Sequence, residues 1–207
     1  MRKPDVGVLK TKTRSTLADA LERFRGAEAT LPAKEYLLLR WVAAMTAVEV
    51  HAIWERYAER RLMVALAIHP GQLIADNGIL GLKHVPIGLA EVIVRGGGRF
   101  IDLRSFEDLL GKATKLLGRT RNPFAAVPSR IREYVDGLAA VRNYIVHRSD
   151  ASSVSYRTAL RKVYGIKAAP DADEFLNAVD YRSTSIQKGQ KRIIGLITAV
   201  AHAVTNS

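Results

Sequence analysis

The residues from 33 to 68 form the longest helical pattern in the chain and constrain its fold most strongly. The run follows Pro32, is rich in Leu, Ala, Glu and Arg, and contains neither Gly nor Pro. These residue types favour helix, so the run predicts one long helix, with a kink left open. One stripe at spacings of three and four residues consists of Leu38, Val42, Met45, Glu49, Ala52 and Arg56. We expect this stripe to be an apolar face that Glu49 and Arg56 interrupt.

The rest of the chain is also predicted to be helical, which gives a mainly α fold built as a helical bundle. Residues 1–14 are basic and lack apolar periodicity, so we expect a flexible basic arm followed by a single domain over residues 15–207. A short helix is expected from Ser15 or Thr16 to near Gly26. Further helices are expected at about 105–117, 129–147, 151–163, 171–182 and 184–204.

Residues 69–104 are the least regular part of the sequence. Pro-Gly and Asn-Gly pairs mark turns there, and three glycines follow at 96–98. Two structures fit the pattern. Residues 92–94 and 100–103 could pair as a short hairpin, whereas residues 87–94 could form a helix that ends at the glycines.

The helix expected at 129–147 carries a cation within its apolar stripe. Arg142 falls in the middle of the side shared by Ile131, Val135, Leu138, Ile145 and Val146. Because Arg keeps its charge, burying it unpaired is costly, so Arg142 must meet a carboxylate, a phosphate or a partner chain. Glu49 is the first candidate to pair with Arg142 and orient its guanidinium. A purely structural alternative is this same bridge, with His147 capping the helix.

His147 follows Arg142 by an interval of about 140° around the helix and about 7.5 Å along it. One helix is therefore not expected to close both side chains on a single phosphate. Two copies of the helix facing each other across a two-fold axis would bring an Arg and a His to a shared groove. Asn143 lies on the face of His147, where it is expected to hold the imidazole or a phosphate oxygen.

The sequence Arg-Asn-Tyr-Ile-Val-His at 142–147, late in a helix of a small helical protein, resembles the Arg-(four to six residues)-His motif of the HEPN superfamily (higher eukaryotes and prokaryotes nucleotide-binding domains). The resemblance implies a helical bundle, a homodimer whose two motifs meet at the interface, and RNA cleavage without metal. It carries over Arg142, Asn143 and His147 as catalytic residues. It also implies a toxin or antiviral defence role and an antitoxin or regulatory protein as a partner. Some members of the superfamily lack nuclease activity and serve as binding or dimerisation modules.

Charge indicates the class of partner. The chain has 32 Lys and Arg against 20 Asp and Glu, a formal net charge of +12, which favours RNA or another polyanion over a neutral metabolite. Arg148 directly follows the motif, and Arg95 and Arg99 flank the three glycines. We expect these three arginines to contact RNA phosphates. Because no nucleotide-loop pattern is present, we interpret residues 95–99 as a flexible basic connection and not as a specific nucleotide loop.

Several classes of function are disfavoured. The chain has no Cys, which removes thiolate catalysis and Cys-ligated metals. Its five histidines show no metal-ligand spacing, so we expect neither a metal nor another cofactor. The N-terminal residues lack the apolar core of a signal peptide, and no uninterrupted transmembrane stretch is evident, so we expect a cytoplasmic protein that does not enter a membrane.

These observations together predict an endoribonuclease that needs no metal. RNA supplies its own nucleophile, the 2′-hydroxyl, so a cleaving site needs a general base, charge stabilisation on the phosphate and a proton for the leaving oxygen. His147 can act as base and acid near neutral pH, and Arg142 can stabilise the phosphate charge. The alternative is a non-catalytic RNA-binding or dimerisation module in which Arg142 only positions a phosphate.

Overall fold

The computed structural model describes residues 5–76, 78, 83–96, 98, 101 and 103–207, and this part of the chain is mainly helical. Two short strands, β1 (Val179–Asp180) and β2 (Gln190–Lys191), pair antiparallel. The helices are α1 (Val6–Thr30), α2 (Tyr36–Ile68), α3 (Gly71–Asp76), α4 (Ile87–Arg95), α5 (Phe106–Leu117), α6 (Ser129–His147), α7 (Asp150–Tyr164), α8 (Ala172–Asn177) and α9 (Arg192–Asn206). The mainly α fold predicted from the sequence is confirmed.

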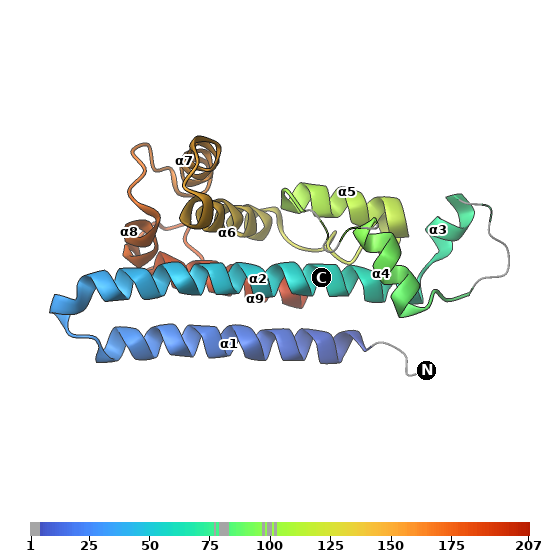
Figure 1. Cartoon of the computed structure of the whole chain (residues 1–207), viewed down its shortest axis with the longest axis horizontal. Helices are drawn as coiled ribbons and strands as arrows, with labels where there is room; N and C mark the ends of the chain where they lie inside the picture. The colour runs from blue at the N-terminus through green and yellow to red at the C-terminus, as the bar shows by residue number, and fades with distance from the viewer. Residues whose placement is uncertain (1–4, 77, 79–82, 97, 99–100, 102) are drawn as a thin grey trace.

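The long helix α2 is the axis of the bundle (Figure 1). Helix α1 runs alongside it, and α5, α6 and α7 lie on the other side of α2 from α1. Helix α9 packs against α1, α2 and α6. The single long helix predicted after Pro32 is therefore confirmed, with a 3-10 turn at Ala33–Glu35 leading into it.

The prediction of a flexible arm up to residue 14 is wrong for the residues that the structure describes, because α1 begins at Val6. Asp5 caps this helix by accepting hydrogen bonds from the backbone N–H groups of Gly7 and Val8. A polar residue, Thr13, interrupts the apolar periodicity of the first turns of α1. Thr13 is nevertheless buried, because its hydroxyl donates to the carbonyl of Leu9 at 2.9 Å. Residues 1–4 lie outside the described part of the chain.

The stripe expected to be the apolar face of α2 is also wrong. Leu38 and Met45 are exposed, with 43% and 39% of their surface accessible, and Glu49 and Arg56 are exposed as well. The buried residues of α2 begin at Ala43 and continue to Ala67 on other faces of the helix. A helix with apolar residues on all sides offers no single stripe, so its neighbours decide which residues are covered.

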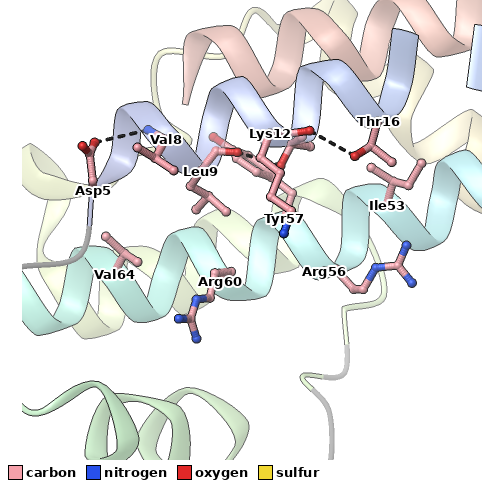
Figure 2. Close-up of a pocket in the computed structure, with 11 residues that line it drawn as sticks. Asp5, Val8, Leu9, Lys12, Thr16, Ile53, Arg56, Tyr57, Arg60 and Val64 are labelled. Carbon is pink, nitrogen blue, oxygen red and sulfur yellow. Dashed lines mark hydrogen bonds between the residues drawn. The ribbon is translucent and has the colours of Figure 1, made fainter. Parts of the chain in front are cut away.

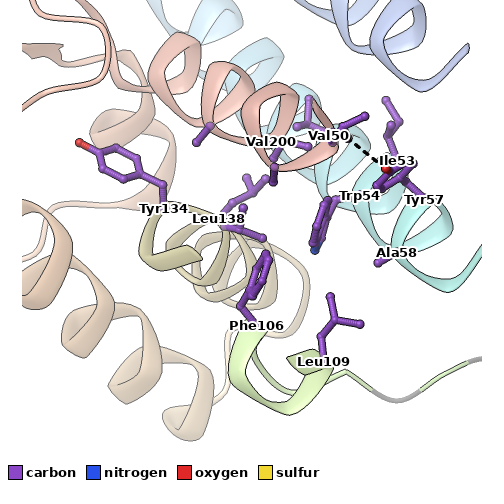
Figure 3. Packing of buried hydrophobic residues seen from close by; sticks show 14 of the residues in the cluster. Val50, Ile53, Trp54, Tyr57, Ala58, Phe106, Leu109, Tyr134, Leu138 and Val200 are labelled. Atoms are coloured by element: carbon purple, nitrogen blue, oxygen red, sulfur yellow. Dashed lines mark hydrogen bonds between the residues drawn. The ribbon is translucent and has the colours of Figure 1, made fainter. Parts of the chain in front are cut away.

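Aromatic side chains from distant segments meet at the centre of the core. The rings of Trp54 on α2 and Phe106 on α5 stack with centroids 5.5 Å apart, and Phe124 meets both edge-on. Figure 3 shows Trp54 and Phe106 with Leu138 of α6 and Val200 of α9 in the same cluster. Tyr57, 2% exposed, donates its hydroxyl to the carbonyl of Val204 at 3.1 Å, which ties α9 to α2.

In the irregular region, the helix alternative is confirmed and the hairpin is wrong for residues 92–94. These residues lie in α4, which ends at Gly96 in the left-handed conformation with φ 59°. Residues 100 and 102 of the expected second strand lie outside the described residues. Farther along, the predicted helix at 105–117 is confirmed as α5, capped by the side chain of Ser105.

The C-terminal region is less helical than expected. Helix α8 stops at Asn177, and the two strands precede α9, so helices over 171–182 and 184–204 are each only partly formed. Asp180, 4% exposed, explains this break. It pairs with Arg182 at 2.6 Å, and Arg182 in turn lies over the ring of Tyr164 at 4.3 Å.

By length and composition alone, α2 is apolar enough to cross a membrane, with a mean hydropathy of 1.3 over an 18-residue window. In the bundle 44% of that window is buried, and a core helix passes the same test.

Truncation of α1 side chains tests whether α1 belongs to the core. Leu17 is 1% exposed, so Leu17→Ala is expected to lower the free energy of unfolding by about 2–5 kcal/mol in urea denaturation. Val8→Ala is the control, because Val8 is 63% exposed and its loss is expected to cost no more than about 0.5 kcal/mol. Equal stability of the two variants would contradict the packing of α1.

Candidate functional site

The Arg142–His147 motif lies where α6 leaves the core. Its buried residues run from Ile131 to Val141, and the last turn after Val141 emerges toward solvent. Arg142 is half-buried, whereas Asn143 and His147 are exposed. The stripe predicted on this helix is therefore correct only in its first half, since Val146 is 49% exposed.

Three side chains of this last turn form a cluster, which we call the α6 cluster: Arg142, Asn143 and His147. Nη1 of Arg142 donates to Oδ1 of Asn143 at 2.9 Å and lies 3.5 Å from Nε2 of His147. A guanidinium has no acceptor, so the second contact is a hydrogen bond only in the tautomer whose Nε2 carries no proton. Once the guanidinium turns to another acceptor such as a phosphate, an unprotonated ring nitrogen at the surface can accept a proton.

Arg142 and His147 therefore meet within one chain. The prediction that one helix does not close both side chains on a single phosphate stays a prediction, because this contact joins the two side chains directly. The backbone spacing was estimated correctly, but the long Arg side chain extends along the helix and bridges the turn. The spacing by itself does not require a second copy. Asn143 holds the guanidinium and not the imidazole in this structure.

The pairing of Glu49 with Arg142 is also wrong. Glu49 pairs with Arg23 of α1 at 2.5 Å, because the side of α2 that carries Glu49 is the side next to α1. The carboxylate whose pKa is lowered by the charge of Arg142 is that of Glu55. Glu55 lies about 120° around α2 from Glu49. Sequence reasoning missed Glu55, although a His–Glu pair at i,i+4 with His51 was a usable signal.

His51 and Glu55 extend the site onto α2. His51 is 6% exposed, and its Nδ1 lies 3.4 Å from Oε2 of Glu55, an ion-pair distance without the alignment of a hydrogen bond. The neighbouring His51 imidazole and the charge of Arg142 hold the pKa of Glu55 below its usual range, although burial acts in the opposite direction. Glu55 thus stays ionised and offsets part of the charge of Arg142.

The three RNA-binding candidates have different positions. Arg148 is exposed at the end of α6, next to the cluster, and adopts a left-handed φ of 45°. The structure does not bring Arg95 to the cluster, because its guanidinium pairs with Glu59 and Glu91 at the end of α4. Arg99 lies outside the described residues.

An exposed apolar surface on α2 adjoins the cluster. We call it the α2 patch, and its residues, with their exposed fractions, are Leu37 (75%), Leu38 (43%), Trp41 (59%) and Met45 (39%). A surface hollow of about 240 Å³ joins Trp41 and Met45 to Tyr144, Ile145 and Arg148 of α6 and its cap. Large apolar side chains gathered on one surface are typical of a binding interface.

The described residues contain no group of three or more His, Asp or Glu side chains placed to hold a metal ion. The polar groups near the α6 cluster are two imidazoles, one guanidinium, one amide and one carboxylate from α2 and α6. Such a set can bind an anion and exchange protons with it.

Titration of Glu55 tests the electrostatics of the site. A depressed pKa means that the pairing of Glu55 is present above the ordinary carboxyl pKa and is lost as the pH falls through the folded value. Carbon-13 NMR of the Glu side chains is expected to show a rise in the pKa of Glu55 in Arg142→Gln and a larger rise in His51→Gln. Arg148→Gln is the control and should leave it unchanged. If the pKa of Glu55 is unaltered in Arg142→Gln, Glu55 is not electrostatically coupled to the α6 cluster.

Comparisons with protein-family models, with curated proteins and with solved structures each find no match for this chain.

Proposed function

We propose that this protein is an endoribonuclease that cleaves RNA without metal and acts as a homodimer. The observation that carries the proposal is the α6 cluster, in which the guanidinium of the half-buried Arg142 and the exposed imidazole of His147 lie 3.5 Å apart. Attack by the 2′-hydroxyl requires two groups, a cation that binds the phosphate and a base beside it. The net charge of +12 supports a polyanionic substrate.

In this reaction His147 and Arg142 have separate roles. Nε2 of His147 takes the proton of the 2′-hydroxyl as the 2′-oxygen bonds to phosphorus. Arg142 donates hydrogen bonds to the non-bridging oxygens, where negative charge grows in the transition state. The bond from phosphorus to the 5′-oxygen breaks, and that oxygen receives a proton from an imidazolium. The products are a 2′,3′-cyclic phosphate and a 5′-hydroxyl.

A second copy of the chain supplies the acid in this scheme. One imidazole cannot be both unprotonated base and protonated acid at the same moment, whereas two copies bring two His147 side chains. The α2 patch lies beside the α6 cluster and offers an apolar surface for such a two-fold interface.

Replacement of His147 tests the reaction. His147→Ala is expected to lower kcat for a mixed-sequence RNA by about 10²–10⁴-fold in EDTA, because the general base is lost, while RNA binding is retained. End-group analysis should find cyclic phosphate ends with the wild type. His202→Ala is the control, since His202 is exposed on α9. Unchanged cleavage in His147→Ala, or absence of cleavage with binding retained in the wild type, would favour a non-catalytic RNA-binding module.

A charge in the α2 patch tests the dimer. Trp41→Asp is expected to convert a dimer into a monomer in size-exclusion chromatography with light scattering, because a buried unpaired carboxylate is costly at an apolar interface. Val154→Asp is the matched control, since Val154 is 62% exposed on α7 and lies outside the patch. A wild-type monomer, or a Trp41→Asp dimer, would remove the α2 patch from the proposal.

A further inference from the structure

A groove between α1 and α2 lies apart from the α6 cluster. Its volume is about 510 Å³, and it runs between the two antiparallel helices from Asp5 and Val64 at one end to Thr16 and Ile53 at the other. Eleven residues of α1 separate its ends, so the groove is about 16 Å long. Figure 2 shows Lys12 on α1, and Arg56 and Arg60 on α2, beside this groove.

These three cations have no carboxylate partner among the described residues. All three are exposed, whereas Arg23, Arg40, Arg95 and Arg182 each hold an ion pair elsewhere in the chain. Asp5 is the acidic residue lining the groove, and its Oδ1 caps α1. The groove therefore keeps a positive charge that an anionic ligand can neutralise.

The spacing of the cations suits a nucleic acid strand. Arg56 and Arg60 are one helical turn apart, which places them about 6 Å apart along α2 on the same face. This distance is comparable with that between neighbouring phosphates in an extended strand. Guanidinium groups bind phosphate oxygens through two parallel hydrogen bonds, and Lys12 adds a point charge on the opposite border.

The floor of the groove argues against a protein helix as the occupant. An amphipathic helix needs exposed apolar surface for its anchoring side chains. Ile53, Tyr57 and Val64 line the groove but are 4%, 2% and 3% exposed, since they are already packed in the core. Val8, near one end of the groove, is a lining residue that does expose apolar surface, at 63%. A charged backbone that tracks along the two borders needs no such anchors.

The groove and the α6 cluster share helix α2, with α1 on one side of it and α6 on the other (Figure 1). The charges of Arg142 and Arg56 both lower the pKa of Glu55 on this helix. A strand bound at both places would therefore pass around α2.

We propose that the groove between α1 and α2 binds the phosphate backbone of a single RNA strand that extends beyond the cleaved bond. This inference rests on the proposed function, since it extends the substrate of that site into a strand several nucleotides long. The contacts are to phosphates, so the groove recognises length and charge, and base identity is not read there.

Binding of a strand that cannot be cleaved tests the groove independently of catalysis. Fluorescence anisotropy would compare 2′-O-methyl RNA of about 16 and about four nucleotides, which span the usual range of single-strand sites. Arg56→Gln with Arg60→Gln is expected to weaken binding of the longer strand about tenfold or more at low salt. The slope of log affinity against log salt should fall by about 1.4, for two lost phosphate contacts. Binding of the shorter strand should change little.

The matched control is Arg157→Gln with Arg161→Gln. These arginines are also exposed and lie one turn apart on α7. Their replacement removes the same charge, at a place far along the chain from the groove. The control double variant is expected to bind the longer strand like the wild type. With cleavable RNA, the groove variant should raise KM for the longer strand and leave kcat unchanged.

Two results would overturn the proposal. Equal affinities for wild type and groove variant, or equal losses in the groove and control variants, would show that the groove makes no specific contact. Unchanged RNA affinity, together with binding of an acidic amphipathic peptide that depends on Arg56 and Arg60, would assign the groove to a protein partner. Failure of the proposed function is seen separately, because His147→Ala changes cleavage and leaves this binding unaltered.

Discussion

The need to cover α2 on every side organises the molecule. Six consecutive residues from Leu62 to Ala67 are buried, which is more than one full turn of helix, so no single neighbour can shield them. Helices α1, α4, α6, α8 and α9 all pack on α2, and burial of its apolar surface is the main force that holds them there. Where this cover ends, before Ala43, α2 exposes Trp41 and its apolar neighbours. The surface proposed for dimerisation is thus the uncovered end of the core helix.

The candidate site forms at the edge of the same cover. Val141 is fully buried, and Arg142 directly after it is only half-buried, so the guanidinium keeps contact with water and avoids the cost of burial. Glu55 offsets part of its charge from α2 without closing an ion pair on it. A cation held in place but incompletely neutralised is suited to bind a phosphate, and His147 lies beside it. Core packing positions these groups, while their exposure leaves them accessible.

Among the described residues, the basic side chains divide into those that are paired and stabilise the fold and those that remain unpaired at the surface. With 32 basic and 20 acidic residues, the chain cannot pair every cation. Several arginines, such as Arg40 and Arg182, are fixed by Asp residues of the C-terminal region and serve the fold. Within the part of the chain that the structure describes, Lys12, Arg56 and Arg60 beside the groove between α1 and α2 have no such partners. Sequence alone gives the surplus of charge, but the place of the unpaired cations depends on which faces of α1 and α2 remain open.

The sequence by itself determined the features that depend on neighbouring residues. Helix α5 with its Ser105 cap and the placement of Arg142 and His147 on one late helix both follow from local rules. The helix that ends at Gly96 was one of two structures that the sequence allowed. The tertiary structure alone decided which faces of α2 are covered, and therefore that Glu49 pairs with Arg23 while the charge of Arg142 acts on Glu55. The physical reason is that a helix with apolar residues all round has no preferred face until other helices pack on it.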